Sequence, residues 1–165
     1  MDVAQRAQYD RFPSNLTRAL LLLDRRLAAA LPEAANALRA SSLAPAWREA
    51  VILRVAALEH SDYERFQHLG PAHKAGLTAT QIADIEGGDY GALDAGLACV
   101  LRFVDATVAA PQVSDEVFDA ARTALTDQHL ATVIVLVGHY LTVARLTGIL
   151  GVEVDDQPDS WTHEH

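Results

Sequence analysis

Two carboxylates and a histidine capable of acid–base chemistry, Glu49, Glu64 and His68, lie within twenty residues of one another. Glu49 belongs to the helical segment APAWREAVILRVAALEH, where the residues three, four and seven positions further on are all apolar. A carboxylate on such a face is desolvated unless it is paired, and desolvation raises its pKa toward the range useful to a general acid or base. The alternative is an ion pair with Arg48, Arg54 or a basic residue elsewhere in the fold.

The next helix begins at Ser61 and carries Glu64 and His68 one turn apart on the same face. A carboxylate beside an imidazole favours the imidazolium and fixes the ring, which prepares a histidine to shuttle protons. Two structural explanations compete. A helical histidine is often only a hydrogen-bonded residue, and Ser61-x-x-Glu64 is a capping box for the first turn. Glu64 can therefore serve as a cap, as the partner of His68, or as both.

His60, Glu64 and His68 are spaced four apart, and two histidines with one carboxylate form a known metal-ligand set. At about 1.5 Å rise per residue, however, His60 and His68 would be about 12 Å apart along a helix axis, too far to share one ion. We therefore expect no metal and no cofactor. A metal-assisted enzyme, using two of these ligands and a third from another helix, remains an alternative.

Composition narrows the classes of function. A single cysteine, Cys99, excludes an intrachain disulfide, a four-cysteine zinc site and a CxxC redox pair, and its apolar surroundings indicate a buried hydrophobe. With 13 Lys+Arg against 22 Asp+Glu, the net charge of −9 repels nucleic acids and anionic membranes. The N-terminus has no apolar signal-like region, and the longest apolar run, Ala131–Val137, is shorter than the roughly 18 residues of a membrane span. We expect a cytoplasmic protein with neither nucleic acid nor membrane as partner.

Apolar residues recur at helical spacing almost throughout, and no segment alternates as a half-buried strand does. The sequence predicts an all-α fold of about seven to eight helices. Pro32 is expected to kink or break one of them. The helices are expected at residues 15–23, 24–40, 45–60, 61–76, 78–87, 93–109, 114–125 and 126–150.

The last of these helices contains the segment VIVLVGHYLTVARL, which sets His139 and Tyr140 side by side. Both residues could line a pocket. They could equally pack in the core or in a subunit interface with their polar atoms satisfied.

Three segments together resemble the carboxymuconolactone decarboxylase family of the AhpD-like superfamily: REAVILRVA, SDYERFQHLGPAHKAGLT and LVGHYLTVARLTGILGVEVDD. The family motif is a Glu followed twelve residues later by C-x-x-C-x-x-x-H and then a Gly. Here it reads Glu49, Ser61-Asp62-Tyr63-Glu64, His68 and Gly76. The resemblance covers about residues 13–156, leaving an N-terminal extension at 1–12 and a polar tail at 157–165.

The resemblance implies an all-helical, homo-oligomeric protein, for which a trimer or hexamer is plausible. Peroxidase members of the family use both motif cysteines as a redox pair, supported by the glutamate and the histidine. Because Ser61 and Glu64 stand in those two positions, thiol peroxidase activity is not expected. The lactone decarboxylases also lack the thiol pair and rely on acid–base groups.

The leading hypothesis is thus a cofactor-independent decarboxylase, isomerase or lyase that acts on a small organic acid, lactone or enolisable carbonyl compound. Glu49 is assigned as the base, and His68, oriented by Glu64, as the acid or as the group that stabilises negative charge. The residues expected to shape the pocket are Tyr63, Phe66, His139 and Tyr140. The other alternative is a non-catalytic, oligomeric ligand-binding or scaffold protein on the same fold.

Overall fold

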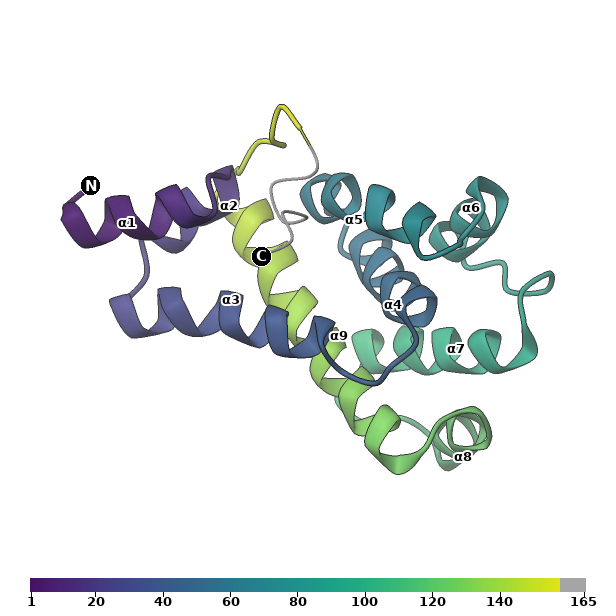
Figure 1. Cartoon of the computed structure of the whole chain (residues 1–165). Coiled ribbons are helices and arrows are strands. Elements are labelled where there is room, and N and C mark those ends of the chain that lie inside the picture. The colour runs from purple at the N-terminus through teal and green to yellow at the C-terminus, as the bar shows by residue number, and fades with distance from the viewer. Residues whose placement is uncertain (158–165) are drawn as a thin grey trace.

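The computed structural model describes residues 1–157, and within that range all regular secondary structure is helical, as the sequence predicts (Figure 1). Residues 158–165, which are most of the predicted polar tail, lie outside the described residues. The described helices are α1 (Val3–Arg11), α2 (Asn15–Leu20), α3 (Arg25–Arg39), α4 (Pro45–Leu58), α5 (Asp62–Lys74), α6 (Ala79–Gly87), α7 (Ala95–Ala109), α8 (Asp115–Ala124) and α9 (Asp127–Ile149).

Helix α4 is the centre of the fold, and it contacts α5, α6, α7 and α9. It starts with Pro45 at a position where a missing N–H costs nothing, and half of its residues are buried, almost without interruption from Glu49 to Ala56. A helix that is apolar on all sides is expected in a core. One apolar cluster joins it to α7, α8 and α9, and a second joins it to α6 and α7. Glu49 is therefore placed in the interior by its own helix.

Helices α1, α2 and α3 form an N-terminal arm on one side of the molecule, and α9 runs between this arm and α4–α6 (Figure 1). Both α2 and α3 contact α9. Leu16 and Leu20 of α2 pack with Tyr63 of α5 and Val143 of α9 in a third, smaller apolar cluster. The arm is thus held mainly by α9 and by a few contacts with α5.

Helix α1 was not expected, because the sequence indicated only an extension at residues 1–12; it brings the number of helices in the described residues to nine. An Asp2/Gln5 capping box starts it. It also has a structural task. Pro32 lies inside α3 without breaking it and has no N–H to offer the carbonyl of Ala28, which instead accepts a hydrogen bond from Gln8 Nε2 of α1 at 3.1 Å.

Helix α9 is the longest of the described helices and is strongly apolar. Among residues 1–157 it is the one helix long and apolar enough to cross a membrane by length and composition, although no uninterrupted apolar run of that length exists. Its buried residues pack into the core against α4 and α7, as those of a central helix do. Ile134, Val135 and Ile149 of α9 are exposed.

Candidate functional site

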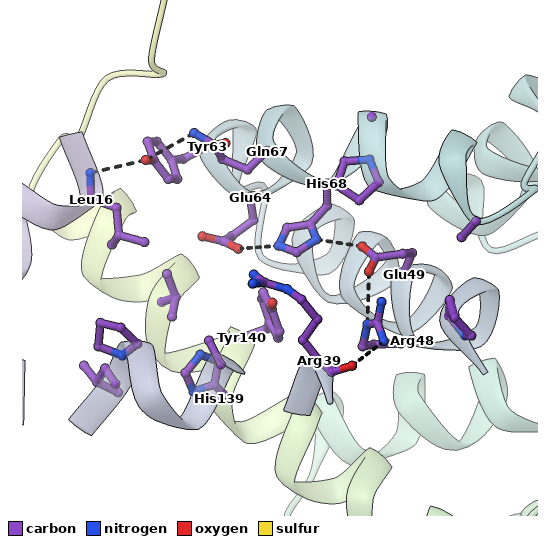
Figure 2. A pocket seen from close by; sticks show the side chains of 18 of the residues that line it. Leu16, Arg39, Arg48, Glu49, Tyr63, Glu64, Gln67, His68, His139 and Tyr140 are labelled. Carbon is purple, nitrogen blue, oxygen red and sulfur yellow. Dashed lines mark hydrogen bonds and ion pairs between the residues drawn. The ribbon is translucent and has the colours of Figure 1, made fainter. Parts of the chain in front are cut away.

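A cavity of about 640 Å³ lies between α5 and the N-terminal arm, with α9 contributing one side (Figure 2). Residues from α2 and α3 form an apolar wall, and residues from α4 and α5 form a polar one. The lining residues are Leu16, Leu20, Leu31, Pro32, Ala35, Arg39, Pro45, Arg48, Glu49, Tyr63, Glu64, Gln67, His68, Gly70, Pro71, Lys74, Ala75, His139, Tyr140 and Val143.

His68 lies between the carboxylates of Glu49 and Glu64 within this cavity (Figure 2). Its Nδ1 is 2.8 Å from Glu49 Oε2, and its Nε2 is 3.6 Å from Glu64 Oε2. Because an ionised carboxylate only accepts hydrogen bonds, Nδ1 carries the proton that is donated to Glu49. The other nitrogen, Nε2, faces Glu64. Two helices therefore converge to place three predicted site residues in one line.

The environments of the two carboxyls move their pKa values in opposite directions. Burial alone raises the pKa of Glu49, but the hydrogen bond and charge of His68 together with the Arg48 guanidinium outweigh it, so the pKa is lowered. Arg48 Nε lies 3.1 Å from Glu49 Oε1, and its Nη1 donates to the carbonyl of Arg39 at 2.9 Å. For Glu64, burial raises the pKa to about 7, and the charge of His68 only partly opposes it.

The sequence left open whether Glu49 is an unpaired carboxylate or one partner of an ion pair. The ion pair with Arg48 is present, so Glu49 is a held carboxylate, and the carboxyl with the raised pKa is Glu64. Ser61 caps α5, because its Oγ accepts the backbone N–H of Glu64 at 3.4 Å. The capping box is incomplete, since the Glu64 carboxyl does not return to the first turn and instead faces His68. Ser61 thus caps the helix, and the Glu64 side chain is left to interact with His68.

Three of the four expected pocket residues line the cavity. Tyr140 is in edge-to-face contact with the His68 ring at 5.0 Å, and His139 contacts Tyr140 in turn. Burial lowers the pKa of His139 and raises that of Tyr140, which keeps both side chains neutral. Tyr63 also lines the cavity, whereas Phe66 is half-buried and does not. Phe66 is two residues away from both Glu64 and His68. Two residues correspond to a rotation of about 200° around the helix axis, so Phe66 lies on another face of α5.

Comparisons with known proteins identify the fold. One similar solved structure is a protein of unknown function from Agrobacterium tumefaciens, described as a putative antioxidant defence protein AhpD. Its TM-score is 0.72 at 17% identity, over 78% of this chain and 90% of that one. Another is a debrominase, Bmp8. A cysteine-to-alanine variant of Bmp8 in complex with 2,3,4-tribromopyrrole gives a TM-score of 0.75 at 11% identity, covering 97% and 92% of the two chains. The apo form gives 0.76 at 11% identity, covering 94% and 86%.

The chain has the AhpD-like fold. The fold expected from the motif resemblance is thereby confirmed. No protein-family model matches the sequence, and no curated protein matches it significantly. At these identities the likeness concerns the backbone arrangement. The chemistry has to be argued from the residues that this AhpD-like chain places in its cavity.

The cavity is also lined by residues that were not predicted from the sequence. Gln67 lies on the cavity face of α5, one turn beyond Tyr63, so a helical projection could have found it. Arg39 and Lys74 line the cavity from α3 and α5, at the ends of their helices. That both line the same cavity depends on how the N-terminal arm packs, for which the sequence has no local signal.

Asp155 ties the two walls of the cavity together from the segment that follows α9. Its Oδ2 accepts hydrogen bonds from Tyr63 Oη and Gln67 Nε2, each at 2.6 Å, and its Oδ1 accepts the backbone N–H of Asn15 at 2.7 Å. Tyr63 Oη in turn accepts the N–H of Leu16 at 3.2 Å. We call this group of Asn15, Leu16, Tyr63, Gln67 and Asp155 the latch.

The remaining candidates of the sequence lie elsewhere. Cys99 is half-buried on α7 and does not line the cavity. His60 is exposed beyond the end of α4 with a positive φ of 52°, and it is not grouped with Glu64 and His68. Within residues 1–157, no three side chains of the His, Cys, Asp or Glu type are arranged to hold a metal ion.

Proposed function

We propose that this protein is a cofactor-independent acid–base enzyme related to the carboxymuconolactone decarboxylases. Its substrate would be a small organic acid, lactone or enolisable carbonyl compound, and its reaction a decarboxylation, isomerisation or elimination. One observation carries the proposal: His68 stands between two carboxyls whose pKa values are moved apart, in a cavity of small-molecule size. Ionisable pairs with separated pKa values mark acid and base roles in enzymes.

The geometry refines the roles expected from the sequence. Glu49, held ionised by Arg48, accepts the Nδ1 proton of His68 and fixes the ring, so it is the orienting carboxylate. Nε2 of His68 is then the base that removes a proton from a carbon or oxygen acid. The imidazolium that forms is stabilised by the negative charge of Glu49. His68 therefore takes the role first assigned to Glu49.

Glu64 supplies the complementary acid. With a pKa raised to about 7, the Glu64 carboxyl can hold a proton near neutral pH. In an isomerisation, His68 Nε2 takes the proton from one atom of the substrate and Glu64 delivers its own to another. The imidazolium then returns a proton to the Glu64 carboxylate across their 3.6 Å separation, which resets both groups. In a decarboxylation, the carbanion left by carbon dioxide takes the Glu64 proton, and water restores it.

The structural neighbours support a small-molecule function on this fold. Bmp8 is described as a debrominase and its variant as holding 2,3,4-tribromopyrrole, so an AhpD-like chain can accommodate a small ring compound. The present chain offers no thiol in its cavity, since its single cysteine, Cys99, lies outside it. Acid–base chemistry is the type that its cavity side chains can perform.

The proposal is tested by proton exchange in D2O. A panel of short keto acids, unsaturated lactones and β-carbonyl acids is followed by NMR for deuterium incorporation, double-bond shift or loss of carbon dioxide. We expect wild-type turnover of at least one compound. His68→Gln should lower the rate at least 100-fold and Glu64→Gln by a similar order, the usual scale for general acid–base groups. The control His60→Asn changes an exposed histidine outside the cavity and should leave the rate unchanged.

A panel compound that binds in the cavity without exchange or turnover, with the other compounds equally inert, would overturn the enzymatic proposal. That result would favour the non-catalytic ligand-binding protein. Turnover that survives in both His68→Gln and Glu64→Gln would remove these residues from the mechanism. Turnover lost on treatment with a chelator and restored by a divalent metal would favour the metal-assisted alternative.

We also propose that the protein acts as a cytoplasmic homo-oligomer. Such contacts would cover exposed apolar side chains, namely Ile134 and Val135 on α9 and Leu22 and Leu27 near the start of α3. Light scattering coupled to size-exclusion chromatography tests the assembly. We expect a trimer or hexamer, and a monomer at micromolar concentration would contradict the proposal.

A further inference from the structure

Two cationic side chains line the cavity, and neither has a carboxylate partner within residues 1–157. Arg39 comes from the end of α3 and Lys74 from the end of α5, on opposite sides of the cavity. The hydrogen bond of the Arg39 guanidinium goes to a neutral side-chain oxygen, Asn36 Oδ1, at 3.2 Å. Among the ion pairs of residues 1–157, neither Arg39 nor Lys74 takes part. Both side chains are exposed at the ends of their helices, and both also line the cavity.

The charge balance of the cavity is therefore opposite to that of the whole chain. Among residues 1–157, the acidic residues that line it are Glu49 and Glu64. The charge of Glu49 is already matched by Arg48, and burial keeps Glu64 largely uncharged up to about neutral pH. The positive charges of Arg39 and Lys74 are left uncompensated. An anionic ligand is the partner that would balance them.

The position of Arg39 relates this charge to the chemical groups. Figure 2 shows its side chain reaching from α3 toward Tyr140, and its charge acts on the Tyr140 hydroxyl. Tyr140 in turn contacts the His68 ring. An anionic group bound by Arg39 would thus lie next to the groups that transfer protons. The rest of the ligand would face the apolar wall formed by Leu16, Leu20 and Leu31.

We propose that the ligand of this cavity is a small carboxylate with an apolar body, and that Arg39 binds its carboxylate, with Lys74 as a second, weaker contact. This inference rests on the proposed function, because it uses the same cavity and names the class of substrate. It adds Arg39 as the residue that selects an anion over a neutral compound of equal shape. A planar guanidinium can bind a carboxylate through two parallel hydrogen bonds.

Binding measurements with matched probes test the inference. Benzoate and benzamide have the same shape and differ in charge, whereas acetate keeps the charge and lacks the apolar body. Titrations by calorimetry and by NMR shifts of the Tyr140 ring should give benzoate at least about tenfold tighter binding than benzamide, the scale of a charge-assisted hydrogen bond. Acetate should bind more weakly than benzoate.

Substitution of Arg39 tests whether this residue causes the preference for benzoate over benzamide. Arg39→Gln should reduce the benzoate-to-benzamide ratio to near one while the affinity for benzamide stays unchanged, and Lys74→Gln should reduce the ratio less. The control Arg26→Gln removes an exposed arginine of α3 that does not line the cavity and should leave the ratio unchanged. Circular dichroism should report the same helix content for all variants, since Arg39 is exposed.

Equal binding of benzoate and benzamide by the wild type would overturn the inference. So would a preference that persists undiminished in Arg39→Gln. The anion site and the acid–base groups can be tested separately. His68→Gln should keep the preference for benzoate over benzamide, because His68 is not the anion contact. A preference for benzoate without turnover of any compound would support the anion site and contradict the enzymatic proposal. Turnover of neutral compounds that Arg39→Gln does not affect would support the enzymatic proposal and contradict the anion site.

Discussion

The two walls of the cavity are built differently. The α4–α5 wall carries the ionisable residues, and its helices are joined to each other and to the core by extensive packing. Glu49 and Glu64 there are 4% and 3% exposed, and each contacts His68. The α2–α3 wall is mostly apolar, and α9 and the latch attach it to the rest of the molecule.

This contrast separates the two requirements of a binding and reacting site. Groups that transfer protons need a fixed geometry, which a buried helix pair with paired charges provides. A wall held by one helix and a few hydrogen bonds opens at lower free-energy cost, and it can admit a ligand. We therefore expect changes in the α4–α5 wall to affect the whole fold, and changes in the arm to act locally.

The largest effect is expected when the paired charge in the rigid wall is broken. Glu49→Ala leaves Arg48 and His68 without their carboxylate and should lower the free energy of unfolding by about 3 kcal/mol, the cost of removing one partner of a buried pair. Urea denaturation measures the change. Glu33→Ala, at an exposed position of α3, is the control and should change stability by less than about 0.5 kcal/mol. A loss as small as that of the control would mean that Glu49 does not anchor this wall.

The second prediction concerns pH and the other carboxyl of the same wall. Burial raises the pKa of Glu64 from 4.5 to about 7, so the folded protein binds a proton there that the unfolded chain has released. This contribution to stability is fully present below about pH 4.5 and is lost as the pH rises through about 7. Glu64→Gln should therefore be more stable than the wild type at pH 8, by up to about 3 kcal/mol.

Urea titrations of Glu64→Gln and the wild type at pH 5, 6, 7 and 8 measure the difference. The two stability curves should separate as the pH rises, with Glu64→Gln above. Parallel curves would mean that Glu64 is charged in the folded protein at neutral pH. Glu64→Gln would then show no gain in stability at pH 8, and the role of Glu64 as a proton donor would lose its support.

The two walls also differ in how well the sequence predicts their structure. The α4–α5 wall is readable, because Glu49, Ser61, Glu64 and His68 stand at helical spacing and their helices have clear start signals at Pro45 and Ser61. Their roles were harder to assign. Whether Glu49 or Glu64 has the raised pKa depends on where Arg48 points, and that is decided by packing.

In the arm, the sequence predicts α2 and α3 but not α1 or the contacts that hold the arm in place. Residues 1–12 have no amphipathic pattern strong enough to indicate α1, which has no buried residue and is held by side-chain hydrogen bonds such as that of Gln8. The latch joins Asn15 to Asp155 across 140 residues, and no local signal reports such a pairing. Asp155 lies near the end of the region that resembles the family, where the sequence assigned it no role.

The third prediction releases the arm from the rigid wall. Asp155→Ala removes the acceptor of Tyr63, Gln67 and Asn15, and it should cost about 2 kcal/mol, in the range for groups left buried and unpaired. Amide hydrogen exchange should increase in α2 and in the first turns of α5, with little change in α4. Asp156→Ala, the exposed neighbour, is the matched control. Equal exchange throughout α4 and α2 would show that the two walls open together.

The smallest predicted effect tests how the arm itself is held. Gln8→Ala removes the hydrogen bond to the Ala28 carbonyl that Pro32 leaves without its helical donor, and it should cost about 1 kcal/mol. Pro32→Ala supplies the missing N–H, so the same Gln8→Ala change made in that background should cost clearly less. A double-mutant cycle by urea denaturation measures this coupling. Equal costs in both backgrounds would mean that α1 does not compensate for the proline, and the arm would then need another reason to keep α3 unbroken.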